Sequence, residues 1–300
     1  MKHLTTLRYI DAIARTGSIR GAADFLSITS TALNRRILAL EEELGVPIFE
    51  RLPRGVRLSS AGEILIHHIR SQLSDMDRVK SQIADLSGVR RGHVSIACSQ
   101  ALIPYFLPEQ IKAYRDQHPG VTFGVHVRDR DAAEQALADH TADLALVFEP
   151  IRMSDFQTIL TAPQHIHAIM GPNHALADKK QLRLKECLLH PVAMPTRIYG
   201  VRHLIEIALI DSGMSIDPVI ESDNFEFLRS YAIAENILSF QLPVGLPDSS
   251  AERGLLTKLI DPRDVPPGLI HFGQLRGRTL PVAVAKFADQ VAKALTARFL

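Results

Sequence analysis

Two short amphipathic segments separated by only three residues constrain the fold of this chain more than any other feature of its sequence. Apolar side chains recur at helical spacing in residues 19–26, and they do so again in residues 33–44. The second of these helices is expected to begin before its first apolar residue, directly after Thr29, so residues 27–29 are the only connector between the two helices. Because helices joined by so few residues must cross at a steep angle, the pattern predicts a helix-turn-helix with Ile28 in its corner.

Helix-terminating residues divide this region into three predicted helices. A first helix is expected over residues 4–14, where apolar side chains again have helical spacing, and it ends at Gly17. Ser18 and Thr29 stand where the second and third helices begin, and both are preferred N-cap residue types. Gly45 is the expected C-cap of the third helix.

The third predicted helix has a polar front end that suits DNA. With its apolar residues buried, four side chains fall on or beside the outward face: Ser30, Thr31, Asn34 and Arg35. The free N–H groups after Thr29 suit a phosphate, and Arg35 and Arg36 add charge for phosphates or a guanine edge. Residues 41–43 are glutamates that phosphates would repel, so only the front of the helix should approach DNA. Considered alone, the helix is explained equally well as an amphipathic helix with a solvated charged face.

A basic β-hairpin is predicted immediately after this helix. Residues 46–59 hold two short alternating stretches around a turn at residues 53–55. Three arginines surround its tip: Arg51, Arg54 and Arg57. Beside a recognition helix such a hairpin is a wing that reaches phosphates or a neighbouring minor groove. The alternative is that the hairpin only closes the small core through its apolar residues.

The distribution of charge favours nucleic acid at the N-terminal end. The net charge of +1 conceals an asymmetry, since residues 1–91 hold 14 Lys and Arg against 10 Asp and Glu, whereas residues 92–300 hold 20 against 23. The basic excess coincides with the predicted helix-turn-helix, although a solvated surface gives a similar excess.

Both the order of the predicted elements and the residues within them match one known family over the stretch "LRYIDAIARTGSIRGAADFLSITSTALNRRILALEEELGVPIFERLPRGVRLSSAGE". This stretch resembles the winged helix-turn-helix of the LysR-type transcriptional regulators, over residues 1 to about 60, and the rest of the chain has the length and element order of that family. The resemblance implies base readout in the major groove by Ser30, Thr31 and Asn34. It also implies phosphate or base contact from Arg35, and wing contacts from Arg51 and Arg54. The family usually has Gln-Pro at the first two positions and Ser at the third, so the base preference of relatives does not carry over.

A long helix is predicted after the hairpin, over residues 60–87. Its apolar residues follow steps of three and four with one stammer, close to a coiled-coil seam: Ile66, Ile69, Leu73, Met76, Val79, Ile83 and Leu86. Ser60 and Glu63 have capping-box spacing. A helix of this length, about 42 Å, needs a partner, which is either the chain's own domains or the same helix of a second chain. Since the linker helix of the family dimerises, we expect a homodimer that assembles further, through the α/β domains, into a homotetramer.

From His93 onward the pattern changes to strands that alternate with helices, as in an open parallel α/β sheet, and a second group of this kind begins near His165. Two α/β lobes joined by crossing strands resemble the periplasmic-binding-protein fold, which the family uses as an effector domain. The predicted domains are a winged helix-turn-helix at 1–59, a linker and dimerisation helix at 60–88, and an effector-binding domain at 92–300, with lobe I at 92–162 and 267–300 and lobe II at 163–266.

Ligands of open α/β sheets bind beyond the carboxyl ends of the strands, which places a cleft between the two predicted lobes. The candidate effector-binding residues there are Ser99, Gln100, Ala101, Arg128, Asp129, Arg130, Phe148, Glu149, Pro195, Thr196 and Arg197. By resemblance, the regions around Ser99 and Thr196 match the effector-contacting loops of the family. The arginines suit an anionic effector such as a carboxylate, although any single one is explained as an ordinary surface arginine.

Other chemistries find little support in the sequence. It contains no G-x-S-x-G elbow, Walker-type phosphate loop, G-x-G-x-x-G or H-E-x-x-H motif, so we expect neither an enzyme nor a cofactor. The histidines show no metal-ligand grouping. Cys98 and Cys187 match no metal or redox spacing and are expected in the core, with a redox switch as the lesser alternative.

The expected protein is an α/β regulator with an N-terminal winged helix-turn-helix, a long linker helix and a two-lobed effector domain. It binds double-stranded DNA, responds to a small-molecule effector and contacts RNA polymerase. The absence of a signal peptide and of a membrane-spanning stretch predicts the cytoplasm and excludes a membrane partner. The alternative is a cytoplasmic small-molecule-binding protein whose N-terminal domain serves mainly protein assembly.

Overall fold

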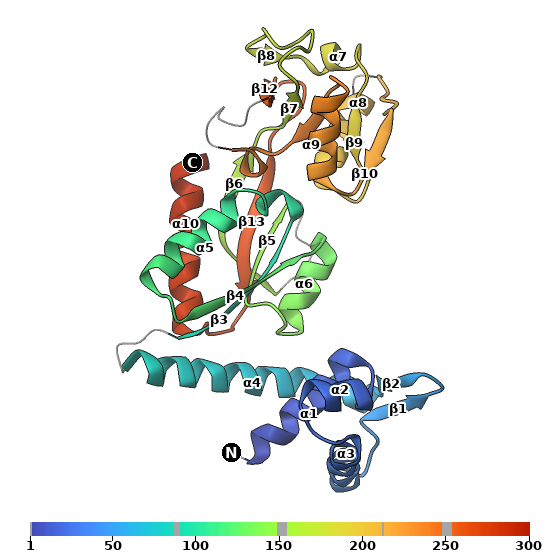
Figure 1. Ribbon diagram of the computed structural model, residues 1–300, viewed down its shortest axis with the longest axis vertical. Coiled ribbons are helices and arrows are strands. Elements are labelled where there is room, and N and C mark those ends of the chain that lie inside the picture. The colour runs from blue at the N-terminus through green and yellow to red at the C-terminus, as the bar shows by residue number, and fades with distance from the viewer. Residues whose placement is uncertain (1, 87–90, 149–154, 212, 248–253) are drawn as a thin grey trace. The chain divides into compact units, whose positions relative to one another are not determined.

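The computed structural model describes residues 2–86, 91–148, 155–211, 213–247 and 254–300, and the chain forms two compact units, Met1–Ser87 and Gly88–Leu300. The elements of the first unit (Figure 1) are α1 (Lys2–Thr16), α2 (Ile19–Phe25), α3 (Ser30–Leu44), β1 (Phe49–Leu52), β2 (Gly55–Leu58) and α4 (Ser60–Leu86). The three predicted helices, the hairpin and the long helix are all confirmed.

Capping residues fix the helix boundaries of the first unit. The hydroxyl of Ser18 accepts a hydrogen bond from the Gly21 N–H at the start of α2. The hydroxyl of Thr29 likewise accepts from the Ala32 N–H at the start of α3, and both oxygen–nitrogen distances are 3.2 Å. Gly45 ends α3 with a φ of +70°, a left-handed conformation that favours glycine. The predicted caps of these two helices are confirmed.

The N-cap of α4 is Ser59, so the prediction of a capping box at Ser60 and Glu63 is wrong. The Ser59 hydroxyl accepts from the Gly62 N–H at 3.0 Å and donates to the Pro47 carbonyl oxygen at 2.6 Å. Ser59 is the N-cap because its side chain joins the start of α4 to the segment before β1, whereas the side chain of Ser60 is exposed.

The front half of α4 packs on its own domain. Ile66 and Ile69 are buried in one core with α1 and α3, and Leu73 packs against that core. The carboxylate of Asp11 on α1 accepts from Arg70 on α4 at 2.9 Å, and both side chains are almost buried. The intramolecular alternative therefore holds for the first part of the predicted seam. Further along, Val79 and Ile83 are exposed.

Lobe I of the second unit is built on a five-stranded sheet in the order β4-β3-β5-β13-β6. Its elements are β3 (Gly92–Cys98), a 3₁₀ turn (Gln100–Leu102), α5 (Phe106–Gln117), β4 (Val121–Val127), α6 (Arg130–Ala138), β5 (Leu144–Phe148), β6 (Phe156–Gln164), β13 (Gly268–Leu275) and α10 (Val282–Phe299). Helices α5 and α10 cover one face of the sheet and α6 covers the other (Figure 1).

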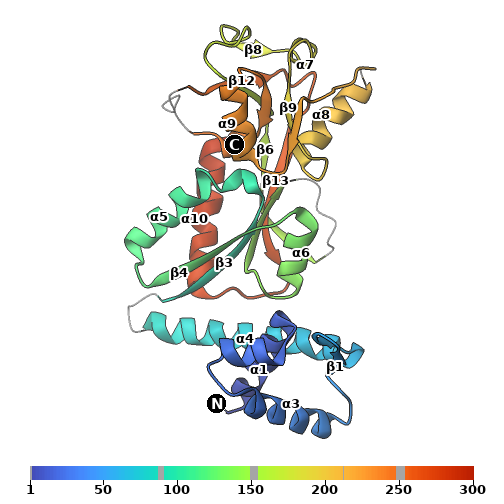
Figure 2. The ribbon, with the colours of Figure 1, turned by 45° about the vertical axis from the view of Figure 1, so that its right-hand side comes forward.

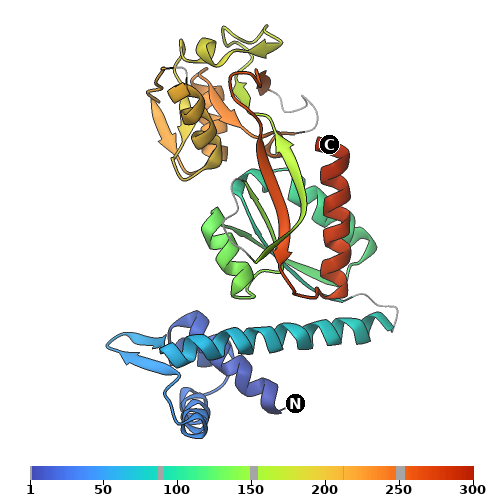
Figure 3. The same ribbon diagram turned by 180° about the vertical axis from the view of Figure 1, so that it is seen from behind.

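The prediction of a parallel sheet is correct for four of the five strands and wrong for β13. Strands β3, β4 and β5 are parallel, but β13 runs antiparallel to both β5 and β6. The reason is topological: β6 leaves lobe I for lobe II, and β13 brings the chain back beside it, as Figure 3 shows.

Lobe II holds two smaller sheets, in the orders β11-β7-β12-β8 and β10-β9. Its elements (Figure 2) are β7 (His167–Met170), β8 (Gln181–Leu182), α7 (Leu184–Cys187), β9 (Ala193–Pro195), α8 (Gly200–Asp211), β10 (Ile220–Ser222), α9 (Phe225–Ala234), β11 (Ser239–Gln241), a 3₁₀ turn (Pro243–Gly245) and β12 (Leu256–Ile260). The chain crosses between the lobes after Gln164 and again before Gly268. Among the described residues, no helix combines the length and the apolar character needed to cross a membrane.

Candidate nucleic-acid interface and effector cavity

The front of α3 presents polar side chains opposite its buried residues. Leu33 and Ile37 are buried in the core, whereas Ser30, Thr31 and Arg35 are exposed. The Thr29 hydroxyl caps α3 and is therefore already engaged. The contribution of this position to the surface is the start of the helix, where backbone N–H groups without a partner inside the helix are exposed. The exposed groups can donate and accept hydrogen bonds at base edges.

The hairpin and α3 meet through a side-chain contact. The Arg51 guanidinium on β1 donates to the side-chain amide oxygen (Oδ1) of Asn34 on α3, at a nitrogen–oxygen distance of 3.4 Å. Arg54 lies exposed in the two-residue turn between β1 and β2. Arg57 instead forms an ion pair with Glu50 at 2.7 Å, which offsets its charge. The wing therefore offers Arg51 and Arg54, and Arg51 lies next to a predicted base-reading residue.

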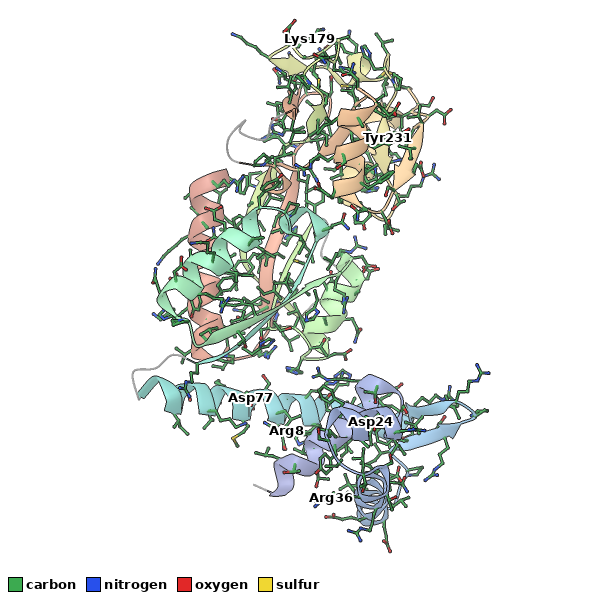
Figure 4. The ribbon with its side chains drawn as sticks, in the orientation of Figure 1. Arg8, Asp24, Arg36, Asp77, Lys179 and Tyr231 are labelled. Atoms are coloured by element: carbon green, nitrogen blue, oxygen red, sulfur yellow. The ribbon has the colours of Figure 1, made fainter. Side chains whose placement is uncertain are left out.

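Two residues of α3 have contacts that the sequence does not reveal. The Arg36 guanidinium (Figure 4) lies over the Tyr9 ring of α1, 5.6 Å from the ring centroid, and so packs on the domain itself. A carboxylate oxygen of Glu41 accepts from the N–H groups of Ile48 and Phe49, at 2.7 and 3.1 Å. Glu41 thus anchors the start of β1 to α3, and only its place in a run of glutamates was visible in the sequence.

A cavity of about 370 Å³ lies between the two lobes of the second unit, at the carboxyl ends of β3, β4 and β5. The predicted residues that line it are Ser99, Ala101, Arg128, Asp129, Arg130, Phe148 and Arg197. Lobe II adds Tyr199, the first turn of α8 beginning at Gly200, and Phe225 from the start of α9. A cavity of this size accepts a small organic molecule.

Three predicted effector-binding residues do not line the cavity: Gln100, Pro195 and Thr196. The Gln100 side chain accepts from the Phe225 N–H at 2.6 Å, so it joins the lobes instead. Thr196 holds its loop together, because its N–H donates to the Ser222 carbonyl and its carbonyl accepts from the Tyr199 N–H. Pro195 is buried in β9, and Glu149 lies outside the described residues.

Three arginines and two aspartates form the charged lining of the cavity: Arg128, Arg130 and Arg197, with Asp129 and Asp131. Arg128 is exposed and donates to the neighbouring Val127 carbonyl at 3.0 Å, and Arg130 pairs with Asp131 at 2.9 Å. The Asp129 carboxylate caps α6 by accepting from the Ala132 N–H, so part of its charge already serves the fold. An anion in this cavity would meet guanidinium groups and the N-terminus of α8, both of which favour negative charge.

A buried arginine supports the lobe II side of the cavity. The Arg202 side chain is only 2% exposed and pairs with Glu206 at 2.6 Å and Glu221 at 2.9 Å. Glu206 also pairs with Arg197 at 3.3 Å. Although burial opposes the charged form of Glu206, hydrogen bonds from Arg202 and Arg197 hold its pKa below the ordinary value. Arg202 is not among the residues predicted from the sequence, although its spacing from Glu206 fits a helical ion pair.

Phe148 joins the lobes at the floor of the cavity. A Cβ atom placed on Gly200 would lie 2.4 Å from the Phe148 ring, and one placed on Gly268 would lie 2.2 Å from it. Glycine at both positions therefore lets the ring fit between the end of β5 and the start of α8. A further contact between the lobes is the hydrogen bond from Arg229 of α9 to the Tyr105 hydroxyl, at 2.7 Å.

Both cysteines are fully buried, as expected for core residues. Burial raises the pKa of each thiol to about 12, so both stay protonated at neutral pH. Because the thiolate is the reactive form, this argues against a redox switch.

Family models match both units of the chain. A model described as a bacterial regulatory helix-turn-helix protein of the lysR family matches residues 4–63, and the LysR substrate binding domain matches residues 87–296. The chain belongs to the LysR family. It is a DNA-binding transcriptional regulator whose activity responds to an effector bound in the two-lobed domain. The family match favours this function over an N-terminal domain that serves mainly assembly.

Individual members of the family are similar over most of this LysR-type regulator. It is 25% identical to the HTH-type transcriptional activator CmpR of Synechocystis over 218 residues, which are 73% of this chain and 71% of CmpR. Among solved structures, a full-length cysteine variant of OxyR from Pseudomonas aeruginosa matches with a TM-score of 0.74 and 18% identity, over 96% of this chain and 94% of OxyR. Full-length CbnR complexed with its target DNA matches with a TM-score of 0.57 and 17% identity, over 97% and 99%. These two likenesses show the fold.

Proposed function

We propose that the front of α3 reads an operator in the major groove of double-stranded DNA while the wing contacts the flanking backbone or minor groove. The observation that carries this assignment is the contact between Arg51 and Asn34, which brings a wing cation beside the predicted base-reading residues. Ser30, Thr31 and Arg35 complete the base-reading surface, and Arg54 extends from the wing tip. Arg36 is assigned to phosphate only, because its guanidinium lies over Tyr9.

Two substitutions separate base readout from phosphate contact. Asn34→Ala should weaken binding to the operator more than binding to random DNA, because it removes a base contact. Arg54→Ala should weaken both and reduce the salt dependence of binding by roughly one counterion. Arg57→Ala is the matched control, since that guanidinium already pairs with Glu50. Equal losses for Asn34→Ala and Arg54→Ala on every DNA sequence would remove these assignments.

The effector that we propose is a small organic anion, such as a carboxylate, bound in the cavity between the lobes. Arg128, Arg197 and the N-terminus of α8 supply the positive potential, and Phe148 supplies an apolar surface. A thermal-shift screen of small carboxylates and their uncharged amides tests this. Carboxylates should raise the melting temperature, and Arg128→Ala should weaken the best one roughly 10- to 100-fold. Lys112→Ala, an exposed residue of α5, is the control. Preference for the amides would contradict an anionic effector.

Effector binding is proposed to change the angle between the lobes, and through it the bend of the DNA and the contact with RNA polymerase. The two hydrogen bonds between lobes, from Phe225 to Gln100 and from Arg229 to Tyr105, are contacts that such a rotation would alter. Solution scattering of the full-length protein on its operator should change when effector is added. An unchanged profile would count against the mechanism.

The proposal also covers the oligomeric state of the protein and its location in the cell. The exposed Val79 and Ile83 on the second half of α4 support a homodimer, and exposed Ile207 and Ile210 on α8 support further assembly of the α/β domains into a homotetramer. A protein that regulates transcription in this way works in the cytoplasm, and we assign it no catalytic activity. Sedimentation velocity of the purified protein tests the assembly states.

A further inference from the structure

The contact between Arg51 and Asn34 fixes the hydrogen-bonding character of one part of the α3 surface. Nη2 of Arg51 donates to Oδ1 of Asn34 at 3.4 Å. Because a guanidinium carries donors and no acceptor, the oxygen of the Asn34 amide has to face Arg51, and its NH₂ group is turned away. Within the described residues this is the only hydrogen bond of the Asn34 side chain, so both N–H hydrogens of that amide remain for another partner.

The backbone of the hairpin directs Arg51 toward α3. Alternate residues of a strand point to the same face, and Phe49, two residues before Arg51, is buried in the core to which α3 contributes. The Glu41 carboxylate on α3 accepts from the Phe49 N–H at 3.1 Å, which holds the start of β1 against that helix. Glu50 points to the opposite face of the hairpin, where it pairs with Arg57, its neighbour in the strand register. The position of Arg51 beside Asn34 therefore follows from the fold of the wing.

Bases differ in the donors and acceptors that they present in the major groove. Guanine presents two neighbouring acceptors, N7 and O6, whereas adenine presents the N7 acceptor beside the N6 amino donor. An unrestrained asparagine suits adenine, since its oxygen accepts from N6 while its nitrogen donates to N7. In this protein the Asn34 oxygen is directed at the Arg51 guanidinium, so the two side chains together offer donors to a base edge.

We propose that Asn34 and Arg51 act as one donor-only pair that specifies a guanine in the operator. The inference rests on the proposed base readout by α3 and names the base that is read. Asn34 donates from Nδ2 to one acceptor of guanine, and the remaining N–H groups of Arg51 donate to the other. Adenine is rejected because its N6 amino group would meet donors only. The preference for guanine over adenine should be roughly 5- to 150-fold in affinity.

Selection of binding sites from a random DNA library by the full-length protein tests the pair. Asn34→Ala identifies the position, because it relaxes the base that Asn34 reads, and the wild-type protein should select guanine there. Arg51→Ala frees the Asn34 oxygen, so the preference at that position should move from guanine to adenine. Arg57→Ala, on the same hairpin, is the matched control and should leave the selected base unchanged, since that guanidinium already pairs with Glu50.

Base analogues in the selected site measure the contact itself. Replacing the guanine with 7-deazaguanine removes the N7 acceptor and should weaken wild-type binding at least about fivefold. Inosine keeps N7 and O6 and lacks only the minor-groove amino group, so it should bind as guanine does. Melting temperatures check that the variants are folded.

Two results would overturn the proposal while leaving base readout by α3 intact. One is selection of a base other than guanine at this position by the wild-type protein, and the other is a guanine preference that persists in Arg51→Ala. Recovery of no preferred sequence at all would contradict both this inference and the proposed function on which it rests.

Discussion

Glu41 offers a sharp test of how the wing is held. Its carboxylate accepts two hydrogen bonds from the N–H groups of Ile48 and Phe49, and both of these residues are buried. A hydrogen bond to a charged group contributes about 1.5–3 kcal/mol, and a buried N–H left without a partner costs about 1–3 kcal/mol. With some rescue by water, Glu41→Ala should destabilise the first unit by about 2–4 kcal/mol. Glu41→Gln, which keeps an acceptor oxygen, should cost only about 1 kcal/mol.

Denaturant unfolding of the full-length protein, followed together with operator binding and effector binding, measures this effect. Glu41→Ala should shift the unfolding of the first unit and weaken operator binding at least about tenfold, while effector binding stays unchanged. Glu42→Ala and Glu43→Ala are matched controls, because these neighbouring side chains are exposed. If all three alanine variants behaved alike, Glu41 would be an ordinary solvated charge and the anchoring role would be refuted.

Three further outcomes follow from the geometry. Gly200→Ala should weaken effector binding in a calorimetric titration, because its Cβ would lie 2.4 Å from Phe148, and a variant with unchanged affinity would show that the ring moves freely. Ile83→Glu should break the α4 contact and lower the assembly state in sedimentation velocity, since this exposed residue lies on the second half of α4; an unchanged assembly state would place that interface elsewhere. Cys98 and Cys187 should resist iodoacetamide in the folded protein at neutral pH, because burial raises the pKa of both thiols to about 12. Rapid labelling, detected by mass spectrometry against an unfolded control, would contradict this.

Local features of the DNA-binding unit were predictable because they depend on nearest neighbours in the chain. The caps at Ser18 and Thr29 and the left-handed Gly45 need only a few residues of context. Which of Ser59 and Ser60 caps α4 could not be predicted from neighbouring residues, because the Ser59 hydroxyl is held by a hydrogen bond to the distant Pro47 carbonyl oxygen. Glu41 escaped prediction for the same reason, because its partners lie seven and eight residues away.

In the second unit, strand order and loop roles limited what the sequence could predict. The carboxyl ends of β3, β4 and β5 were correctly expected to surround one cavity, and Arg128 lines it. The antiparallel direction of β13 depends on how the chain returns between the lobes, which hydrophobic patterns do not encode. Gln100 and Thr196 lie in the expected loops, but the Gln100 side chain bonds to the fold itself, and the buried Thr196 hydroxyl has no hydrogen-bond partner among the described residues.

The most direct test of the central claim is selection of binding sites from a random DNA library by the full-length protein. The account predicts enrichment of one sequence with dyad symmetry, whose half-sites are separated by whole helical turns. Asn34→Ala should relax the selected bases, while Arg54→Ala should preserve them and lower only the overall yield. Recovery of no preferred sequence, or of sites that Asn34→Ala leaves unchanged, would contradict sequence-specific readout by the front of α3.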